Sequence, residues 1–211
     1  MDFWSSFPIF NFMPNANMFN CYAFSPMSMP FFDFSSGFYG GGGDTFVRST
    51  DSKSSITPRT DGDFDKMLKF VLSVEGGYTD NDCGQAGNKG ILQSTYDSYR
   101  KSKGLATNPV KNITDEEVKD LYYNMFYKAS GADKVKDSTL ALYVFDTAVN
   151  MGVGAAKSLL SQCGGSSSKF KQLRLARYES IATNKPAKAK FLTGWKNRVT
   201  KAESFAGREL A

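Results

Sequence analysis

Histidine is absent from the 211 residues of this chain, and its absence removes several kinds of catalysis. Ser-His-Asp and Cys-His nucleophile systems need an imidazole base, and the zinc hydrolases that cut amide bonds normally use imidazole ligands. The three cysteines, Cys21, Cys83 and Cys163, lack the spacing of a zinc site or of a disulfide framework. We therefore expect no metal and no cofactor. An enzyme built on this chain would rely on Asp and Glu as acid or base.

Long apolar runs are also missing. No stretch approaches the roughly 20 apolar residues that a membrane span needs, and the chain does not open with the positively charged region of a usual signal peptide. We expect no stable membrane insertion and a monomer. The expected place of action is the cell wall or periplasm, with residence in the cytoplasm until release as the alternative.

Basic residues are absent before Arg48. All 26 Lys and Arg therefore follow residue 47, where 18 acidic residues oppose them and the net charge is +8. Such a surface suits an anionic polymer, which includes nucleic acid, a membrane face and a bacterial wall. No nucleic-acid-binding module is recognisable, and 14 of the 30 aromatic residues lie before Arg48, apart from the Lys and Arg, so nucleic acid is not expected as a partner.

Residues 1–60 differ in composition from the remainder. Residues 1–46 hold 11 of the 18 Phe, 5 of the 8 Met and 4 of the 7 Pro, without helical or strand periodicity. Four glycines at 40–43 and a polar stretch at 49–60 are typical of a linker. The composition predicts a disordered segment, with a docking or assembly role as the alternative.

Helical periodicity begins at Asp63, a candidate N-cap. Apolar residues recur on one face, at Phe64, Met67, Leu68, Val71 and Leu72, and Gly76 is a candidate stop. Glu75 follows Phe64 by eleven positions, which returns it to within about 20° of the apolar face. This position predicts a partly buried carboxyl group with a raised pKa, as a general acid needs. A solvated glutamate at a frayed helix end is the alternative.

Further helical patterns follow. Ser94 with Asp97, and Thr114 with Glu117, fit the capping-box spacing. Amphipathic or apolar stretches occur at 138–152, 155–160, 169–183 and 187–204. The sequence predicts an all-α fold, with a small hairpin allowed between Tyr78 and Ile91.

Several blocks resemble glycoside hydrolase family 108, a family of lysozyme-like proteins sometimes labelled secretion activators. The blocks are "VEGGYTDNDCGQAGNKGI", "TYDSYRKSKGL" and "NITDEEVKDLYYNMFYKASGADKV". The stretch from "LALYVFDTAVNMGVGAAKSLL" through "FLTGWKNRV" is similar to the peptidoglycan-binding domain that usually follows. The resemblance implies a lysozyme-like fold, with a catalytic part at 61–131 and a helical binding part at 132–205 packed on it.

The resemblance implies cleavage of the bond between N-acetylmuramic acid and N-acetylglucosamine, with peptidoglycan glycan strands as the partner. Glu75 matches the family's catalytic glutamate in E-G-G-Y. The family usually continues with a stretch like D-P-G-G-x-T-x-x-G-I. Here Cys83, Gln85 and Gly87 replace the proline, a glycine and the threonine.

Glycoside hydrolysis usually takes a second carboxyl group. Asp82 ranks first because it follows Glu75 on the same loop, Asp80 ranks second, and Asp146 ranks third, with a structural role as its alternative. A lytic transglycosylase, which works with one Glu, and a non-catalytic peptidoglycan-binding protein are the rival functions.

Five further residues are candidates for substrate binding. Gly76 and Gly77 would let the backbone turn beside the glycan. Tyr78 and Tyr96 are candidates for stacking on sugar rings, with core packing as the alternative for each. Asn150 is a candidate for hydrogen bonding to an acetamido group, or it caps its helix.

Overall fold

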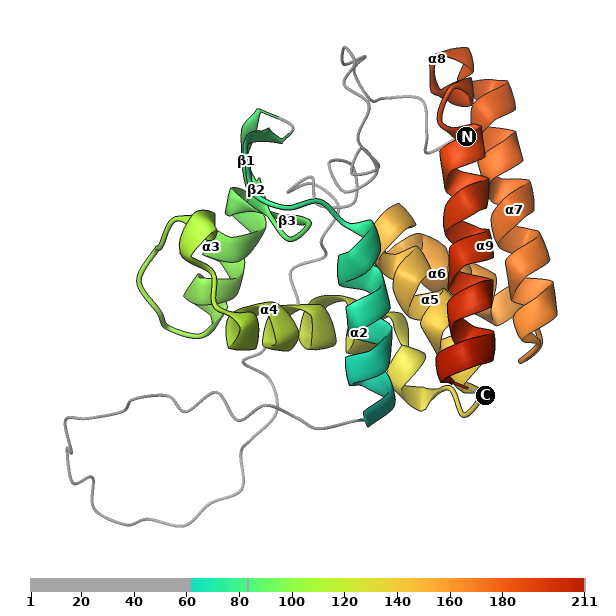
Figure 1. Cartoon of the computed structure of the whole chain (residues 1–211), viewed down its shortest axis with the longest axis horizontal. Helices are drawn as coiled ribbons and strands as arrows, with labels where there is room; N and C mark the ends of the chain where they lie inside the picture. Colours follow the sequence, from blue (N-terminus) through green and yellow to red (C-terminus); the bar gives the residue numbers. More distant parts are fainter. Residues whose placement is uncertain (1–61, 83, 211) are drawn as a thin grey trace, which may run out of the picture.

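The computed structural model describes residues 62–82 and 84–210 of the chain (Figure 1). The predicted disordered segment at 1–60 lies outside these residues. The described chain is mainly helical with one small sheet, which confirms the predicted fold class. None of its helices is both long and apolar enough to cross a membrane. The elements follow in the order α2 (Gly62–Val74), β1 (Thr79–Asp82), β2 (Gln85–Asn88), β3 (Ile91–Leu92), α3 (Gln93–Ser102), η3 (Val110–Asn112), α4 (Asp115–Tyr122), η4 (Tyr123–Lys128), η5 (Ala132–Lys134), α5 (Ser138–Met151), α6 (Val153–Gln162), α7 (Ser167–Asn184), α8 (Pro186–Ala189) and α9 (Leu192–Glu209).

The sheet consists of three short antiparallel strands that lie between α2 and α3 in the sequence. Strand β2 lies between β1 and β3, and Asn88 pairs with Ile91. Only Lys89 and Gly90 separate these two partners, and their φ angles are 50° and 75°. Positive φ at both positions is the signature of a type I′ turn, whose twist matches that of paired strands. The hairpin expected between Tyr78 and Ile91 is therefore present.

Local sequence signals decide some helix starts, and tertiary contacts decide others. Thr114 and Glu117 form the predicted capping box at the start of α4. The other predicted box, Ser94 with Asp97, is wrong, because α3 already begins at Gln93 and has no side-chain N-cap. The Ser94 backbone N–H instead donates to the side-chain oxygen of Gln85 at 2.8 Å. A neighbouring strand thus supplies the acceptor that the local sequence was expected to supply.

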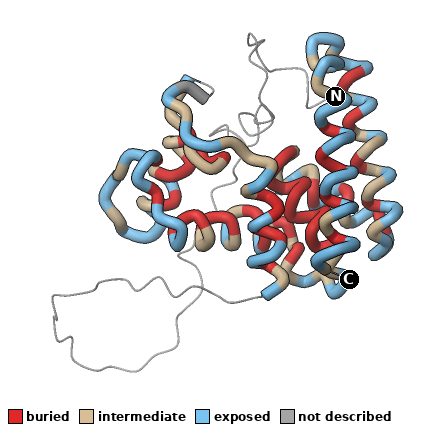
Figure 2. Tube along the Cα trace, in the orientation of Figure 1, coloured by how far each residue is buried: buried red, intermediate tan, exposed pale blue. Residues whose placement is uncertain are grey.

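Helix α5 is the centre of the fold. Every residue from Leu140 to Asn150 is buried, and α5 contacts α2, α6, α7 and α9. Figure 2 shows this burial as a continuous red stretch along α5, with further buried faces on α2 and α4. A single hydrophobic core extends from Phe64 in α2 to Ala206 in α9. The predicted parts at 61–131 and 132–205 therefore share one core.

A smaller apolar cluster joins the two long C-terminal helices, which run side by side in Figure 1. Its centre is the stacked pair Tyr178 of α7 and Trp195 of α9, whose ring centroids are 5.1 Å apart. Val199 completes the buried part of the cluster. This contact holds α9 against α7, and α9 also contacts α2 and α5.

A chain consisting of residues 61–152 should not fold cooperatively. It would expose the faces of α2 and α5 that α7 and α9 cover, and buried apolar area is the main favourable term in folding. Thermal unfolding followed by circular dichroism should show no sigmoidal transition for 61–152 and a single one for 61–211. A sharp transition in the short chain would show that the C-terminal helices are dispensable for folding.

Candidate active site

Glu75 extends α2 by one residue, since its backbone N–H donates to the carbonyl of Val71 at 3.1 Å. The helix therefore aims the Glu75 side chain into the protein, as the apolar periodicity predicts. The side chain is only 3% exposed. Its Oε1 atom accepts a hydrogen bond from Arg198 Nη2 of α9 at 2.8 Å. The alternative of a solvated glutamate at a frayed end does not fit this placement.

The hairpin turn lies directly against the other oxygen of Glu75. A Cβ atom placed on Gly90 would be 3.0 Å from Glu75 Oε2 and 2.8 Å from the hydroxyl oxygen of Tyr122. Tyr122, at the end of α4, donates that hydroxyl to the backbone carbonyl of Lys89 at 2.8 Å. Burial, and then the charge of Glu75, hold the pKa of Tyr122 well above its usual value, so the phenol keeps its proton and remains a donor.

A buried carboxylate, Asp146 of α5, lies on the far side of Arg198. Arg198 Nε donates to Asp146 Oδ1 at 2.9 Å, and Arg198 Nη2 lies 2.7 Å from the same oxygen. Arg174 of α7 pairs with Asp146 Oδ2 at 2.7 Å. Burial raises the pKa of Asp146, but Arg198 and Arg174 outweigh burial and bring the pKa below its usual value. Asp146 is therefore an ionised, structural partner of two arginines.

Arg198 acts on Glu75 against the effect of burial. Desolvation disfavours the charged carboxylate, whereas a guanidinium group at hydrogen-bonding distance favours it. Burial by itself would lower the pKa of Arg198, but Asp146 and Glu75 raise it above its usual value, so Arg198 stays cationic. The sequence predicts the burial of Glu75 but does not identify Arg198 as its partner. The raised pKa expected for Glu75 stays a prediction.

The two candidate acids of the hairpin lie on β1. The backbone of Asp82 pairs with Gln85 of β2, so this residue sits at the end of the hairpin strand. Asp80 is exposed and accepts a hydrogen bond from the hydroxyl of Tyr78. Tyr78 is itself 47% exposed, and the Asp80 contact raises its pKa. Tyr78 thus presents an open aromatic face next to the hairpin.

Gly76 and Gly77 connect Glu75 to the hairpin. Neither has a positive φ, so their backbone conformation does not itself require glycine. A Cβ atom on Gly77 would meet nothing within 4 Å. The space beside Gly77 is therefore open.

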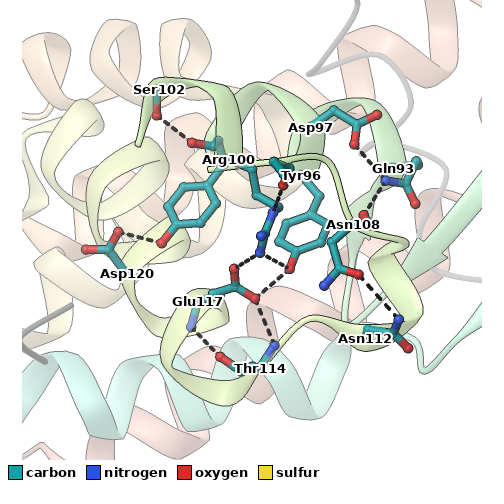
Figure 3. Close-up of polar contacts among 12 residues, drawn as sticks. Gln93, Tyr96, Asp97, Arg100, Ser102, Asn108, Asn112, Thr114, Glu117 and Asp120 are labelled. Atoms are coloured by element: carbon teal, nitrogen blue, oxygen red, sulfur yellow. Dashed lines mark hydrogen bonds and ion pairs between the residues drawn. The ribbon is translucent and has the colours of Figure 1, made fainter. Parts of the chain in front are cut away.

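Two candidates for substrate binding are buried. Figure 3 shows Tyr96 beside Arg100 and Glu117, with its hydroxyl donating to the Glu117 carboxylate. Tyr96 is 0% exposed, which fits the core-packing alternative rather than stacking on a sugar. Asn150 is 3% exposed, and its side-chain oxygen accepts from the Tyr178 hydroxyl. Its position at the end of α5 fits a structural role in the same way.

Sequence reasoning missed Arg198 and Arg174, although a signal for each exists. Arg198 falls in the apolar stripe of α9, among Trp195, Val199 and Ala202. Arg174 interrupts the buried face of α7 in the same way. An arginine on an apolar stripe needs a buried anionic partner. The sequence cannot say which carboxylate that partner is, because Glu75 and Arg198 are 123 positions apart.

The described residues offer no cluster of three or more Asp, Glu or Cys side chains suited to a metal ion. The chemistry of the site as described therefore rests on Glu75, with a cation on one side and a tyrosine and a glycine turn on the other. Such a carboxyl can give or take a proton at a position shielded from water.

The comparisons with known proteins agree with this class of site. The model of the family described as glycosyl hydrolase 108 matches residues 68–152, which include Glu75, the hairpin and Asp146 but neither Arg174 nor Arg198. The matched part is thus similar to glycosyl hydrolase 108, which supports a glycoside hydrolase. Among solved structures, the chain is similar to that of SagA from Brucella abortus, with 23% identity and a TM-score of 0.55. The likeness covers 72% of this chain and 100% of that one, and at this identity it concerns the fold. No curated protein matches this chain.

Replacing Gly90 by alanine should disturb the site as well as the turn. The new Cβ would meet Tyr122 and Glu75 at distances that force one of them to move. Gly104, with φ of 68° and no atom within 4 Å of a Cβ, is the matched control for backbone strain alone. Both variants should lose about 1–2 kcal/mol from left-handed strain. Gly90→Ala should lose more in chemical denaturation and should also lower catalytic activity. Equal losses would show that the turn does not press on Glu75.

Proposed function

We propose that this protein is a peptidoglycan hydrolase that cleaves the bond between N-acetylmuramic acid and N-acetylglucosamine, with Glu75 as general acid. The observation that carries the proposal is the shielded Glu75 carboxylate at the end of α2, under a hairpin turn, inside the part that matches glycosyl hydrolase 108. A glycosidase needs a carboxyl group in such a place, because the leaving oxygen must receive a proton as its bond to the sugar breaks.

The proposed reaction begins with a protonated Glu75. Its proton passes to the glycosidic oxygen while the bond from that oxygen to the sugar C1 breaks, and water adds to C1. A second carboxylate would activate the water or attack C1 itself. Asp82 is the first candidate because its strand belongs to the hairpin that covers Glu75. Asp80 is the second, although it already accepts a hydrogen bond from Tyr78.

The surroundings support a polymeric sugar as substrate. Tyr78 is the exposed aromatic residue at the hairpin, and an aromatic face suits stacking on a sugar ring. The net charge of +8 after residue 47 favours association with an anionic wall. We place the action at the cell wall, with the monomer as the working unit and residues 132–205 contributing to peptidoglycan binding.

A lytic transglycosylase is the second candidate, and one observation favours it. Asp146 shares Arg198 with Glu75, but both of its oxygens are engaged by arginines and it is 0% exposed. Asp146 is therefore not available to activate water. If Asp82 does not serve either, the substrate's own hydroxyl would attack C1, and the product would carry an anhydro-muramic end.

Glu75→Gln should lower the rate of peptidoglycan cleavage by about 10² to 10⁴, the range of general acid-base catalysis. The amide keeps the shape of the side chain and can still accept a hydrogen bond from Arg198, but it has no acidic proton to transfer to the glycosidic oxygen. Turbidity of purified cell walls measures the rate, and mass spectrometry of the fragments distinguishes reducing muramic ends from anhydro-muramic ends. Glu203→Gln, which alters an exposed glutamate paired with Lys171, is the matched control and should be unchanged.

A Glu75→Gln variant that clears walls at the normal rate would remove Glu75 from the mechanism. A wild-type protein that binds walls and releases no fragments would instead identify a non-catalytic binding protein. Anhydro-muramic ends would identify the transglycosylase.

Asp82→Asn should lower turnover on peptidoglycan more than Asp80→Asn, because Asp80 already accepts a hydrogen bond from Tyr78. Both residues belong to a short surface hairpin, so the melting temperature of either variant should stay near that of the wild type. Initial rates on purified walls test the difference. Near-normal rates in both variants would assign the second role to the substrate itself.

A further inference from the structure

Four charged side chains from four separate parts of the chain form one buried cluster. Glu75 follows α2, Asp146 comes from α5, Arg174 from α7 and Arg198 from α9. Their side chains are 3%, 0%, 1% and 6% exposed. The two arginines and the two carboxylates alternate, because Arg174 pairs with Asp146, Asp146 with Arg198, and Arg198 with Glu75.

The geometry of Arg198 joins the two carboxylates. Its Nε and Nη2 atoms both approach Asp146 Oδ1, and the same Nη2 donates to Glu75 Oε1 at 2.8 Å. A guanidinium group is planar and rigid, so contacts at Nε and Nη2 set the direction in which Nη2 points. Asp146 therefore orients the Arg198 N–H group that donates a hydrogen bond to Glu75.

Asp146 is in turn held from its other side. Arg174 pairs with Asp146 Oδ2 at 2.7 Å, and its Nε and Nη2 atoms donate to the Tyr178 hydroxyl at 3.2 and 3.0 Å. Tyr178 donates that hydroxyl to Asn150, one turn after Asp146 on α5. The network thus fixes the Asp146 carboxylate from α7 and α5 together.

We propose that Arg198 is a positioning residue for the Glu75 carboxyl, and that Asp146 and Arg174 hold Arg198 in the orientation which that role requires. The proposal rests on the proposed function only in giving Glu75 its catalytic role. It means that the C-terminal helices complete the active site, since Arg174 and Arg198 both lie outside the part that matches the family model.

The charges of the cluster give the proposal a measurable consequence. With Glu75 ionised, two cations balance two anions, and a proton on Glu75 leaves one buried positive charge in excess. Buried charges are costly when unbalanced. Removing Arg198 should therefore make Glu75 easier to protonate, and removing the charge of Asp146 should make it harder. Tyr122 from α4 is a further polar group near Glu75, and burial keeps its phenol neutral.

A purely structural role would not produce opposite shifts. Replacing either member of a structural ion pair destabilises the fold, whichever sign is removed. Opposite displacements of one titration midpoint arise only if both groups act on Glu75. The titration thus reports the coupling of both charges to Glu75, and the effect of Arg198→Lys on kcat and KM reports the positioning.

The test is a pH titration of the Glu75 carboxyl carbon by NMR in the full chain, with its resonance assigned by its loss in Glu75→Gln. The midpoint should move upward in Arg198→Gln and downward in Asp146→Asn. Lys196→Gln is the matched control, because it removes a cation from the same helix whose partner, Glu179, is exposed. The control should leave the midpoint unchanged.

Arg198→Lys is the second variant, and it keeps the charge while losing the planar fork. It should fold, titrate near the wild-type midpoint, and lose about 10²-fold in kcat with a smaller change in KM, because misplacing a reacting group costs that much. An unchanged midpoint in Arg198→Gln, or a wild-type kcat in Arg198→Lys, would overturn the proposal. The titration needs no activity, so a wild-type chain that cleaves no peptidoglycan would sink the proposed function and leave this test intact.

Discussion

The hydrogen bond from Arg198 to Glu75 connects the two ends of the described fold. It joins the helix that carries the candidate acid to the last long helix, across 123 positions of sequence. Both side chains are buried, so each charge there is stabilised by the opposite one. Asp146 and Arg174 extend the same requirement through α5 and α7. The same ion pairs therefore hold the four helices together and fix the position of the Glu75 carboxylate.

The hairpin closes the site from the opposite side. Its tightest point is the turn at Lys89 and Gly90, and the absence of a side chain at Gly90 lets the turn approach Glu75 and Tyr122. A glycine is needed here for two separate reasons, the positive φ and the close approach. The acid therefore lies between a helical cluster and a short strand connection, and the exposed Tyr78 directly precedes the first strand of the same hairpin.

The glycosyl hydrolase 108 match covers the part of the chain that carries the acid, the hairpin and the central helix. The structure adds that this part and the C-terminal helices share a core and a buried charge cluster. In the proposed hydrolase, residues 132–205 therefore have two tasks, association with peptidoglycan and support of the acid. The support of the acid follows from the hydrogen bond that Arg198 donates to Glu75.

The sequence by itself determined the mainly helical fold, the capping box at Thr114 and the inward direction of Glu75, and it allowed a hairpin between Tyr78 and Ile91. These features depend on periodicity and on residues a few positions apart, which a sequence displays directly. It did not determine the partners of Glu75, the burial of Tyr96 and Asn150, or the start of α3. Each of these depends on side chains from elements far apart in the chain, such as Arg198, Glu117, Tyr178 and Gln85. Tertiary structure decided them because an arginine in an apolar stripe indicates that a buried anionic partner is needed. Only the packing of the helices determines which carboxylate is that partner.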